Sequence, residues 1–270
     1  MMKRRLTILW IAILAMVCAS CQKVIDVKLD DSTSQIVIQG EITTGAGPYQ
    51  VSITQSKNFD EDNDFAVRDD AEVTIADLTS GTTETLTNIG SGLYNTFSTQ
   101  GMAGHAYLMT VVLAGKTYTA SSTIPLKAVK LTKLLTEPSA VDATKIYMVP
   151  VFTDPVGKGN YYRIRQWVNG VQITGSIVAD DQATDGKTYS SLLYYDTSSD
   201  SGNPSIKDGD QLLVELQCID LGAYTYFRTL GSTIAQDAAT PANPISNISG
   251  GALGVFNACQ SSKISGKANF

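Results

Sequence analysis

The sequence predicts an all-β protein with two β-sandwich domains in tandem and one short helix near residues 221–236. Apolar residues alternate with polar residues over many short segments, as is typical of strands with one buried face. Turn-forming glycines recur about every ten residues, a spacing that favours sandwiches or barrels. A chain of 270 residues with 43% apolar side chains is long enough to bury two cores.

The first sandwich is expected at residues 35–124. Its alternating segments are residues 36–38, 49–54, 71–76, 93–97, 107–113 and 117–120. Glycine-led turns are followed by tyrosines, as in Gly92-Leu-Tyr94 and Gly115-Lys-Thr-Tyr118. This order of motifs resembles transthyretin-like and fibronectin-like sandwiches of the immunoglobulin-like class. The resemblance implies an architecture and says little about function.

The second domain is expected at residues 130–270, because Pro125 interrupts strand pairing in the segment 121–130. Asn169-Gly170 between alternating residues predicts a hairpin. Asp220 is expected to cap the helix, and a glycine-rich loop should lead into a last strand. The expected strands are residues 146–152, 161–168, 171–177, 189–195 and 211–219.

Residues 1–20 have the three parts of a secretory signal peptide. Three basic residues precede an unbroken apolar run at residues 6–17, and two small residues stand directly before Cys21. Twelve apolar residues in a helix span about 18 Å, well short of the roughly 30 Å hydrocarbon core. We therefore expect no permanent membrane span in this segment.

The small residues before Cys21 resemble the lipobox of bacterial lipoproteins. The resemblance implies a diacylglycerol on the Cys21 sulfur, cleavage just before Cys21, and acylation of the new amine. Cys18 is a rival site but follows the bulky Val17, and an ordinary signal peptide with a chance cysteine is the alternative. Several acyl chains form a durable anchor. Residues 21–34 would then be a lipidated tether, and losing three basic residues would change the net charge from −6 to −9.

The whole mature chain resembles a family of Bacteroidetes-type outer-membrane lipoproteins catalogued as a domain of unknown function. The resemblance rests on residues 21–26, 40–51, the acidic segment 58–63, and Asn247-Ile-x-Gly250-Gly251-x-Leu-Gly254-x-Phe256. Members are often encoded beside TonB-dependent outer-membrane receptors. The resemblance therefore implies an accessory role at such a receptor, and it brings no reaction, cofactor or catalytic residue. It leaves open whether the chain faces the periplasm or the cell surface.

One strand carries the candidate binding residues. If its even-numbered members face the core, the odd-numbered ones present two aromatic rings and two guanidiniums on an open sheet, groups that often anchor contact surfaces. They could equally stack on a sugar, or pack beneath a loop or the other domain while the arginines reach outward. These residues are Tyr161, Arg163, Arg165 and Trp167.

The acidic segment offers a weak calcium candidate at Asp60, Asp62 and Asp64. An EF-hand loop would need a glycine where Phe65 stands and a glutamate where Ala71 stands, so a solvated acidic loop is the favoured interpretation. No other metal site and no cofactor is expected.

The remaining reactive side chains favour structural roles. His105 stands at a turn, and the chain has no Gly-x-Ser-x-Gly motif to position a nucleophile. An exported protein reaches an oxidising compartment, which allows a disulfide between Cys218 and Cys259. Buried free thiols are the preferred interpretation, although the disulfide stays open.

The sequence therefore favours a lipid-anchored, non-enzymatic outer-membrane protein that assists a TonB-dependent receptor or captures its ligand. An acidic chain does not suit sequence-independent nucleic-acid binding, which requires a cationic surface. The alternative is a structural or adhesive surface protein whose sandwiches serve as spacers. A hydrolase ranks last, and a cleft lined by Asp180, Asp181 or Asp185 would revive it.

Overall fold

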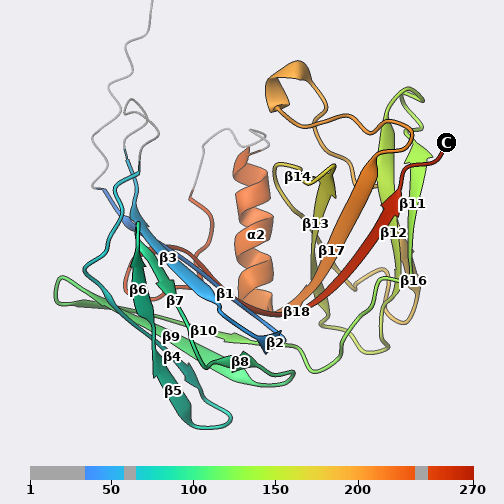
Figure 1. Cartoon of the computed structure of the whole chain (residues 1–270). Helices are drawn as coiled ribbons and strands as arrows, with labels where there is room; N and C mark the ends of the chain where they lie inside the picture. Colours follow the sequence, from blue (N-terminus) through green and yellow to red (C-terminus); the bar gives the residue numbers. More distant parts are fainter. Residues whose placement is uncertain (1–33, 58–64, 235–242) are drawn as a thin grey trace, which may run out of the picture. The chain divides into compact units, whose positions relative to one another are not determined.

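The computed structural model describes residues 34–57, 65–234 and 243–270. The expected signal peptide, Cys21 with all of its tether before Ser34, and the acidic triplet Asp60, Asp62 and Asp64 lie outside the described residues. Residues Ser34–Phe270 form one compact unit, and most of its elements are strands (Figure 1). The predicted all-β class is confirmed.

The first sandwich packs two sheets around one core (Figure 1). One sheet has the order β6-β7-β3-β1 and the other has the order β10-β9-β4-β5, while β2 (Gly45–Ala46) pairs separately with β8 (Gln100–Gly101). Alternation sets which face of each strand is buried. The bounds are β1 (Ile36–Thr43), β3 (Gln50–Gln55), β4 (Glu72–Asp77), β5 (Thr82–Thr85), β6 (Thr87–Gly90), β7 (Leu93–Asn95), β9 (Ala106–Leu113) and β10 (Lys116–Thr123).

The second sandwich packs a sheet of order β14-β13-β17-β18, with β15 also beside β13, against a sheet of order β11-β12-β16. A second core of apolar side chains fills the space between these sheets. A short 3₁₀ turn covers Ser199–Ser201. The bounds are β11 (Lys133–Pro138), β12 (Ile146–Thr153), β13 (Tyr161–Val168), β14 (Val171–Gln172), β15 (Ile177–Asp180), β16 (Thr188–Ser190), β17 (Gln211–Ile219) and β18 (Leu253–Lys267).

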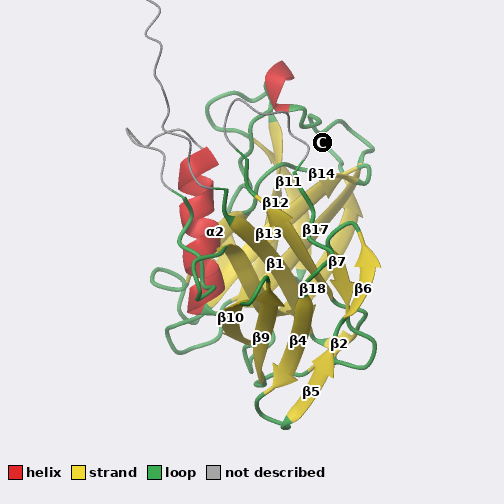
Figure 2. Ribbon diagram, turned by 90° about the vertical axis from the view of Figure 1, so that its left-hand side faces the viewer, coloured by secondary structure: helices red, strands yellow, loops and turns green. Residues whose placement is uncertain are grey.

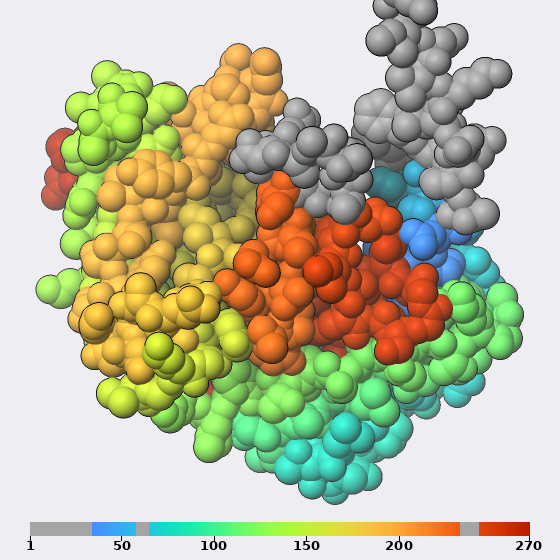
Figure 3. All heavy atoms as spheres, turned by 180° about the vertical axis from the view of Figure 1, so that it is seen from behind, coloured from blue at the N-terminus to red at the C-terminus, as the bar shows by residue number. Residues whose placement is uncertain are grey.

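Strand β18 belongs to both sandwiches. Its residues 253–259 pair in parallel with β1, and its residues 260–267 pair antiparallel with β17. The two halves of the chain therefore share one continuous sheet. Figure 3 shows the orange-red segment before β18 against the green strands of the first sandwich, where Ser249 and Thr119 exchange backbone hydrogen bonds of 2.8 and 3.3 Å.

The helix α2 (Leu221–Ile234) packs beside the shared sheet (Figure 2). Asp220 caps it as predicted, because the Ala223 amide donates to its Oδ1 at 2.8 Å. The apolar face of the helix, which includes Ala223 and Phe227, forms a third cluster with Val255 and Cys259 of β18. Residues 235 and 236 of the expected helix lie outside the described residues.

Two expected strands of the second half differ from the structure. The segment 171–177 is divided into β14 and β15, which leaves residues 173–176 outside the ladder. Of the expected strand 189–195, only residues 189 and 190 lie in a strand, as part of β16 (Thr188–Ser190). The later tyrosines of this segment pack around Tyr147 instead. Conversely, β11 had no clear alternation and was missed. The Asn169-Gly170 turn is confirmed, with positive φ at both residues as such a turn requires.

Candidate functional site

Strand β13 presents its alternating side chains to opposite faces of the sheet. The even-numbered side chains are buried, and the odd-numbered ones are partly exposed on the other face. This is the orientation on which the predicted binding surface depends. Its members are Tyr161, Arg163, Arg165 and Trp167.

Helix α2 covers part of that surface. The Tyr161 ring lies 4.8 Å from a helix tyrosine ring, and the Arg163 guanidinium lies 3.7 Å from the centroid of the Phe227 ring. Arg165 extends farther from the helix, with its guanidinium 5.6 Å from the Trp167 ring. The structure therefore brings the two arginines together and uses Tyr161 for packing.

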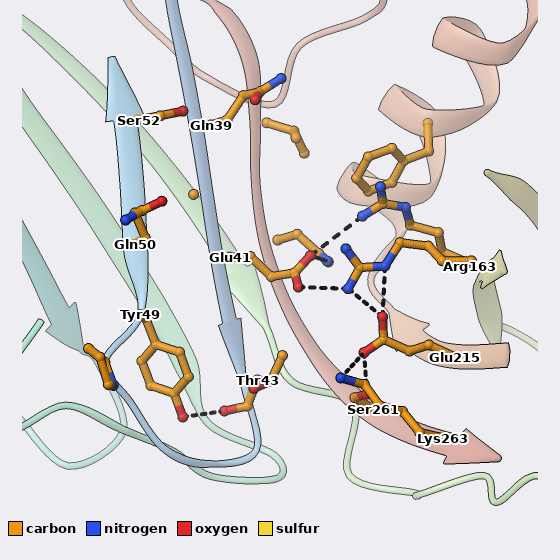
Figure 4. Close-up of a pocket in the computed structure, with 16 residues that line it drawn as sticks. Gln39, Glu41, Thr43, Tyr49, Gln50, Ser52, Arg163, Glu215, Ser261 and Lys263 are labelled. Atoms are coloured by element: carbon orange, nitrogen blue, oxygen red, sulfur yellow. Dashed lines mark hydrogen bonds and ion pairs between the residues drawn. The ribbon is translucent and has the colours of Figure 1, made fainter. Parts of the chain in front are cut away.

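A cleft of about 570 Å³ lies beside the two arginines (Figure 4). Strands β1, β3, β13, β17 and β18 contribute lining residues, as does α2. Most of its lining is polar, and the charged members are Glu41, Arg163, Arg165, Glu215 and Lys263. The cleft is therefore assembled on the sheet that both sandwiches share.

Strand register places these charges side by side. Arg165 stands opposite Glu215, and Glu215 stands opposite Lys263, across three neighbouring strands. Glu41 of the first sandwich stands opposite Asn257 of β18. Because cross-strand neighbours on one face are in contact distance, the pairing alone positions carboxylates among cationic and amide donors.

Glu215 is the buried anchor of this network. Its side chain is 2% exposed and forms an ion pair with Arg165, whose Nε donates to Oε2 at 2.7 Å. The Ser261 hydroxyl donates to Oε1 at 2.6 Å, and the Lys263 ammonium lies 3.6 Å from the same oxygen. A buried carboxylate is tolerated when it is paired and hydrogen-bonded in this way.

Glu41 is held more loosely. Arg163 and Arg165 each donate to it at 3.4 Å, Asn257 donates at 3.2 Å, and the Gln217 amide donates at 3.0 Å. Its side chain is 32% exposed, in contrast to Glu215. Glu41 therefore links the sandwiches while keeping access to the cleft.

Arg163 remains a cation at neutral pH despite its surroundings. Burial lowers its pKa to about 10, with a further lowering from neighbouring Arg165, while Glu41 raises it. Its Nε is buried and has no hydrogen-bond partner. Asn257 is 1% exposed, and its Oδ1 also has no partner. Two residues that line the cleft thus each have one buried polar atom without a hydrogen-bond partner, a donor on Arg163 and an acceptor on Asn257.

A second cavity, of about 670 Å³, lies on the other side of Arg163 and Phe227. Ile164, Leu230 and tyrosines of the 191–206 segment contribute to a more apolar lining. Its buried polar member is Gln166, which is 4% exposed and has an unpartnered Oε1.

The other predicted side chains have structural environments. His105 Nδ1 lies 2.8 Å from Asp77 Oδ2. Burial alone would raise the pKa of Asp77, but hydrogen bonds from His105, Ser80 and Thr79 lower it to about 2. His105 and Asp77 therefore stabilise the turn that enters β9.

The aspartates that would revive a hydrolase bind local groups. Asp180 accepts from Tyr224, and Asp185 accepts from the Gly157 amide. Asp181 is 2% exposed and accepts from the Asn160 amide at 3.0 Å. None of these three aspartates contributes to the lining of the two cavities described above.

Cys218 and Cys259 are both free and buried. Cys218 packs in the second core, whereas Cys259 packs in the cluster beneath α2 on the other face of the sheet. Side chains on opposite faces cannot be bridged without moving the backbone. Burial raises the pKa of Cys218 to about 11 and also raises that of Cys259, so both thiols stay protonated at neutral pH.

In the part of the chain that the structure describes, His, Cys, Asp and Glu side chains nowhere gather as three or more around a metal position. Nor does this part contain a helix long and apolar enough to cross a membrane.

Sequence reasoning identified Arg163 and Arg165 but missed Glu41, Glu215, Asn257 and Lys263. Glu215 had a detectable pattern, because a single charged residue inside the apolar run Gln211–Ile219 indicates a buried partner. Glu41 and Asn257 had no detectable sequence pattern, because they come together only through the parallel pairing of β1 with β18, which are far apart in the sequence.

The fold and site define an all-β protein of two sandwiches that share a sheet and a polar cleft. The chain belongs to the family described as a domain of unknown function (DUF4249), whose model matches residues 22–265. This confirms the expected family at that level. No curated protein matches the sequence.

Among solved structures, the chain is similar to the two fibronectin type-III domain segment from chicken tenascin. The identity is 13%, the match covers 69% of this chain and 91% of that chain, and the TM-score is 0.22. The fold description therefore rests on the strand pairing itself.

Proposed function

We propose that this protein is a lipid-anchored, non-enzymatic protein of the outer membrane that captures a ligand in the cleft and assists a TonB-dependent receptor. The observation that carries the binding role is the cleft itself. It combines a charge network from both sandwiches with two unmatched buried polar atoms. Buried polar groups are normally hydrogen-bonded, so unmatched ones in a cleft indicate a missing partner.

The cleft suits holding a ligand better than transferring protons. Glu215 is fixed by an ion pair and further hydrogen bonds, and Glu41 has four donors around it. A general base must lie within hydrogen-bond reach of the proton that it takes, whereas these two carboxylates already accept hydrogen bonds from donors of the chain itself.

The anchor is supported by the leader sequence and by Cys21. Three basic residues, an apolar run too short to span a membrane, and small residues before a cysteine together favour lipidation over simple secretion. An acidic protein surface is not attracted to anionic lipid, so attachment to the membrane would depend on the acyl chains. The receptor partnership is supported by the family resemblance.

Mass spectrometry of the protein purified from its own membrane tests the anchor. We expect an N-terminus at Cys21 carrying acyl chains, and release into the soluble fraction after Cys21→Ala. An intact, unacylated N-terminus would contradict this part of the proposal. Proteinase K treatment of intact cells decides the leaflet, because only a surface-exposed chain would be digested.

Affinity purification through a C-terminal tag tests the partnership. We expect a β-barrel receptor to copurify from detergent-solubilised membranes with the wild-type chain. A tagged, unrelated outer-membrane lipoprotein is the control for non-specific recovery. Repeated recovery of the chain without any such receptor would overturn the accessory role.

A further inference from the structure

We propose that the cleft binds a neutral, hydroxyl-rich ligand, specifically a short oligosaccharide. This inference rests on the proposed ligand-capture function and adds the chemical class of the ligand. It comes from the pairing of charges in the cleft, from the kind of groups that lack partners, and from the predominance of polar residues in the lining.

The charges in the cleft largely neutralise one another. Arg165 pairs with Glu215, and Arg163 lies beside Glu41. The remaining cation, Lys263, is 60% exposed and lies 3.6 Å from Glu215. A charged ligand group that reached the two arginines or the two glutamates would have to separate one of these pairs and leave a charge without its partner, which is costly away from water. A neutral ligand avoids that cost.

The two unmatched atoms are of opposite kinds. Arg163 Nε carries a hydrogen to donate, and Asn257 Oδ1 has lone pairs to accept. The orientation of the Asn257 amide follows from its neighbour, because Nδ2 donates to the Glu41 carboxylate and an oxygen there would face two acceptors. A hydroxyl group both donates and accepts, so a hydroxyl-rich ligand carries groups that can match an atom of either kind.

The rest of the lining is also suited to hydroxyl groups. Gln39, Gln50, Ser52 and Ser261 supply amides and hydroxyls that can donate and accept. The volume of about 570 Å³ lies within the usual range of small-ligand sites, about 300–1,000 Å³. The cleft therefore has room for a ligand of a few sugar rings.

A peptide fits this cleft less well. Peptide specificity depends on pockets for side chains, and few of the lining residues here are apolar. The Phe227 ring, which could have served such a pocket, is covered by the Arg163 guanidinium at 3.7 Å. Recognition must therefore come from hydrogen bonds.

Trp167 provides a local reporter of binding. The sequence contains two tryptophans, Trp10 and Trp167, and Trp10 lies in the expected signal peptide, so Trp167 is the only tryptophan of the mature chain that begins at Cys21. Its ring lies 5.6 Å from the guanidinium of Arg165, which lines the cleft. Occupancy of the cleft should therefore change its fluorescence.

The test titrates this chain with maltotriose, cellotriose, xylotriose and mannotriose, with the acidic trisaccharide trigalacturonate, and with trialanine. We expect saturable fluorescence changes with at least one neutral trisaccharide and none with trialanine. Glu41→Gln should weaken the neutral ligand about tenfold, because a charged acceptor becomes a neutral one. The same change would tighten an anionic ligand. The matched control is Glu72→Gln, an exposed residue of β4 outside the cleft, which should leave affinity unchanged.

Asn257→Leu provides a second variant of similar shape, and we expect it to weaken the neutral trisaccharide by at least about tenfold. Binding of trialanine or trigalacturonate alone would overturn the ligand class. If the affinity for the trisaccharide is the same in Glu41→Gln and Asn257→Leu as in the wild type, the ligand binds outside the cleft and the proposed site is wrong. Absence of any fluorescence change would overturn the inference, and copurification of a receptor would still stand as separate support for the accessory role.

Discussion

The two sandwiches bury their strands in different ways. In the first, β4, β9 and β10 have one buried face and one more exposed face. In the second, β12 and β17 have runs of consecutive buried residues. For β17 the difference arises because its part of the shared sheet is covered by a second layer on one face and by α2 on the other. Sheets with both faces covered lose alternation and gain positions where polar side chains are buried among strands.

The charged residues of the cleft lie where the first sandwich joins the second on the shared sheet. Strand β18 leaves β1 near Cys259 and continues beside β17. Glu41 comes from the first sandwich, whereas Glu215 comes from the second. The comparison therefore predicts that changes in β18 disturb contacts in both sandwiches, whereas changes on one-faced strands disturb contacts in one sandwich only.

The largest effect is expected at Gly254, where β18 begins its pairing with β1. Its φ is +108°, and a Cβ would lie 1.9 Å from the Ile38 carbonyl oxygen. Gly254→Ala should lower the free energy of unfolding by roughly 5 kcal/mol, because backbone atoms must move apart. Urea denaturation followed by circular dichroism measures this change.

Gly81→Ala is the matched control, since Gly81 also has a positive φ, +78°, but a Cβ there meets nothing within 4 Å. It should cost about 1 kcal/mol. If both substitutions lower the free energy of unfolding equally, the close approach of β1 and β18 at Gly254 does not make this position more sensitive than an open turn.

The next effect is expected at Glu215. Glu215→Ala removes the buried partner of Arg165 and should cost about 3 to 4 kcal/mol, because the partly buried guanidinium keeps only its longer, 3.4 Å contact with Glu41. Thermal denaturation at several pH values above 6 provides the measurement. Glu137→Ala, on a more exposed strand, is the control and should change stability by less than about 0.5 kcal/mol.

A smaller effect is expected at Asp220, which joins α2 to the first sandwich. Its Oδ1 caps the helix, and its Oδ2 accepts from the Ser122 hydroxyl at 2.6 Å and the Thr123 amide at 3.0 Å. Asp220→Ala should cost about 2 kcal/mol. Hydrogen exchange should increase in α2 and at the end of β10 together. An increase confined to the helix would contradict the link.

The smallest effect is a pH dependence of stability that originates in the first sandwich, at Glu84 of β5. Burial would raise the pKa of Glu84, but hydrogen bonds from Thr99, Phe97 and Ser98 lower it to about 2. Because the folded pKa lies below the usual value, this stabilisation is present above about pH 4.5 and is lost as the pH falls towards 2.

Glu84→Gln removes this titration. The difference in Tm between wild type and variant should therefore narrow as the pH is lowered from about 5 to 2. A constant difference across that range would show that the Glu84 carboxylate does not stabilise the 97–99 loop through its charge.

Sequence alone predicted the first sandwich better than the second, and the physical reason is periodicity. Strands β3, β4 and β9 of the first sandwich each bury one face, so alternation located them, as it located β13 in the second. The segment 191–195 contains apolar residues but makes no ladder, because its tyrosines pack around Tyr147. Apolar content without a pairing partner does not specify a strand.

The site was predictable only where it lay within one strand. Arg163 and Arg165 were visible from the spacing on β13. Glu41, Asn257 and Lys263 were not, because they reach the arginines through strand pairs far apart in sequence. Local patterns determine which face a residue occupies, whereas register determines which residues meet across the sheet.

The central claim is that β18 makes the two sandwiches a single folding unit. The most direct measurement is urea unfolding followed by hydrogen exchange mass spectrometry at β9 of the first sandwich and β13 of the second. The account predicts coincident transitions at both strands, and a matching shift of both in Gly254→Ala. Two separate transitions, with only the β9 transition shifted by that change, would contradict it.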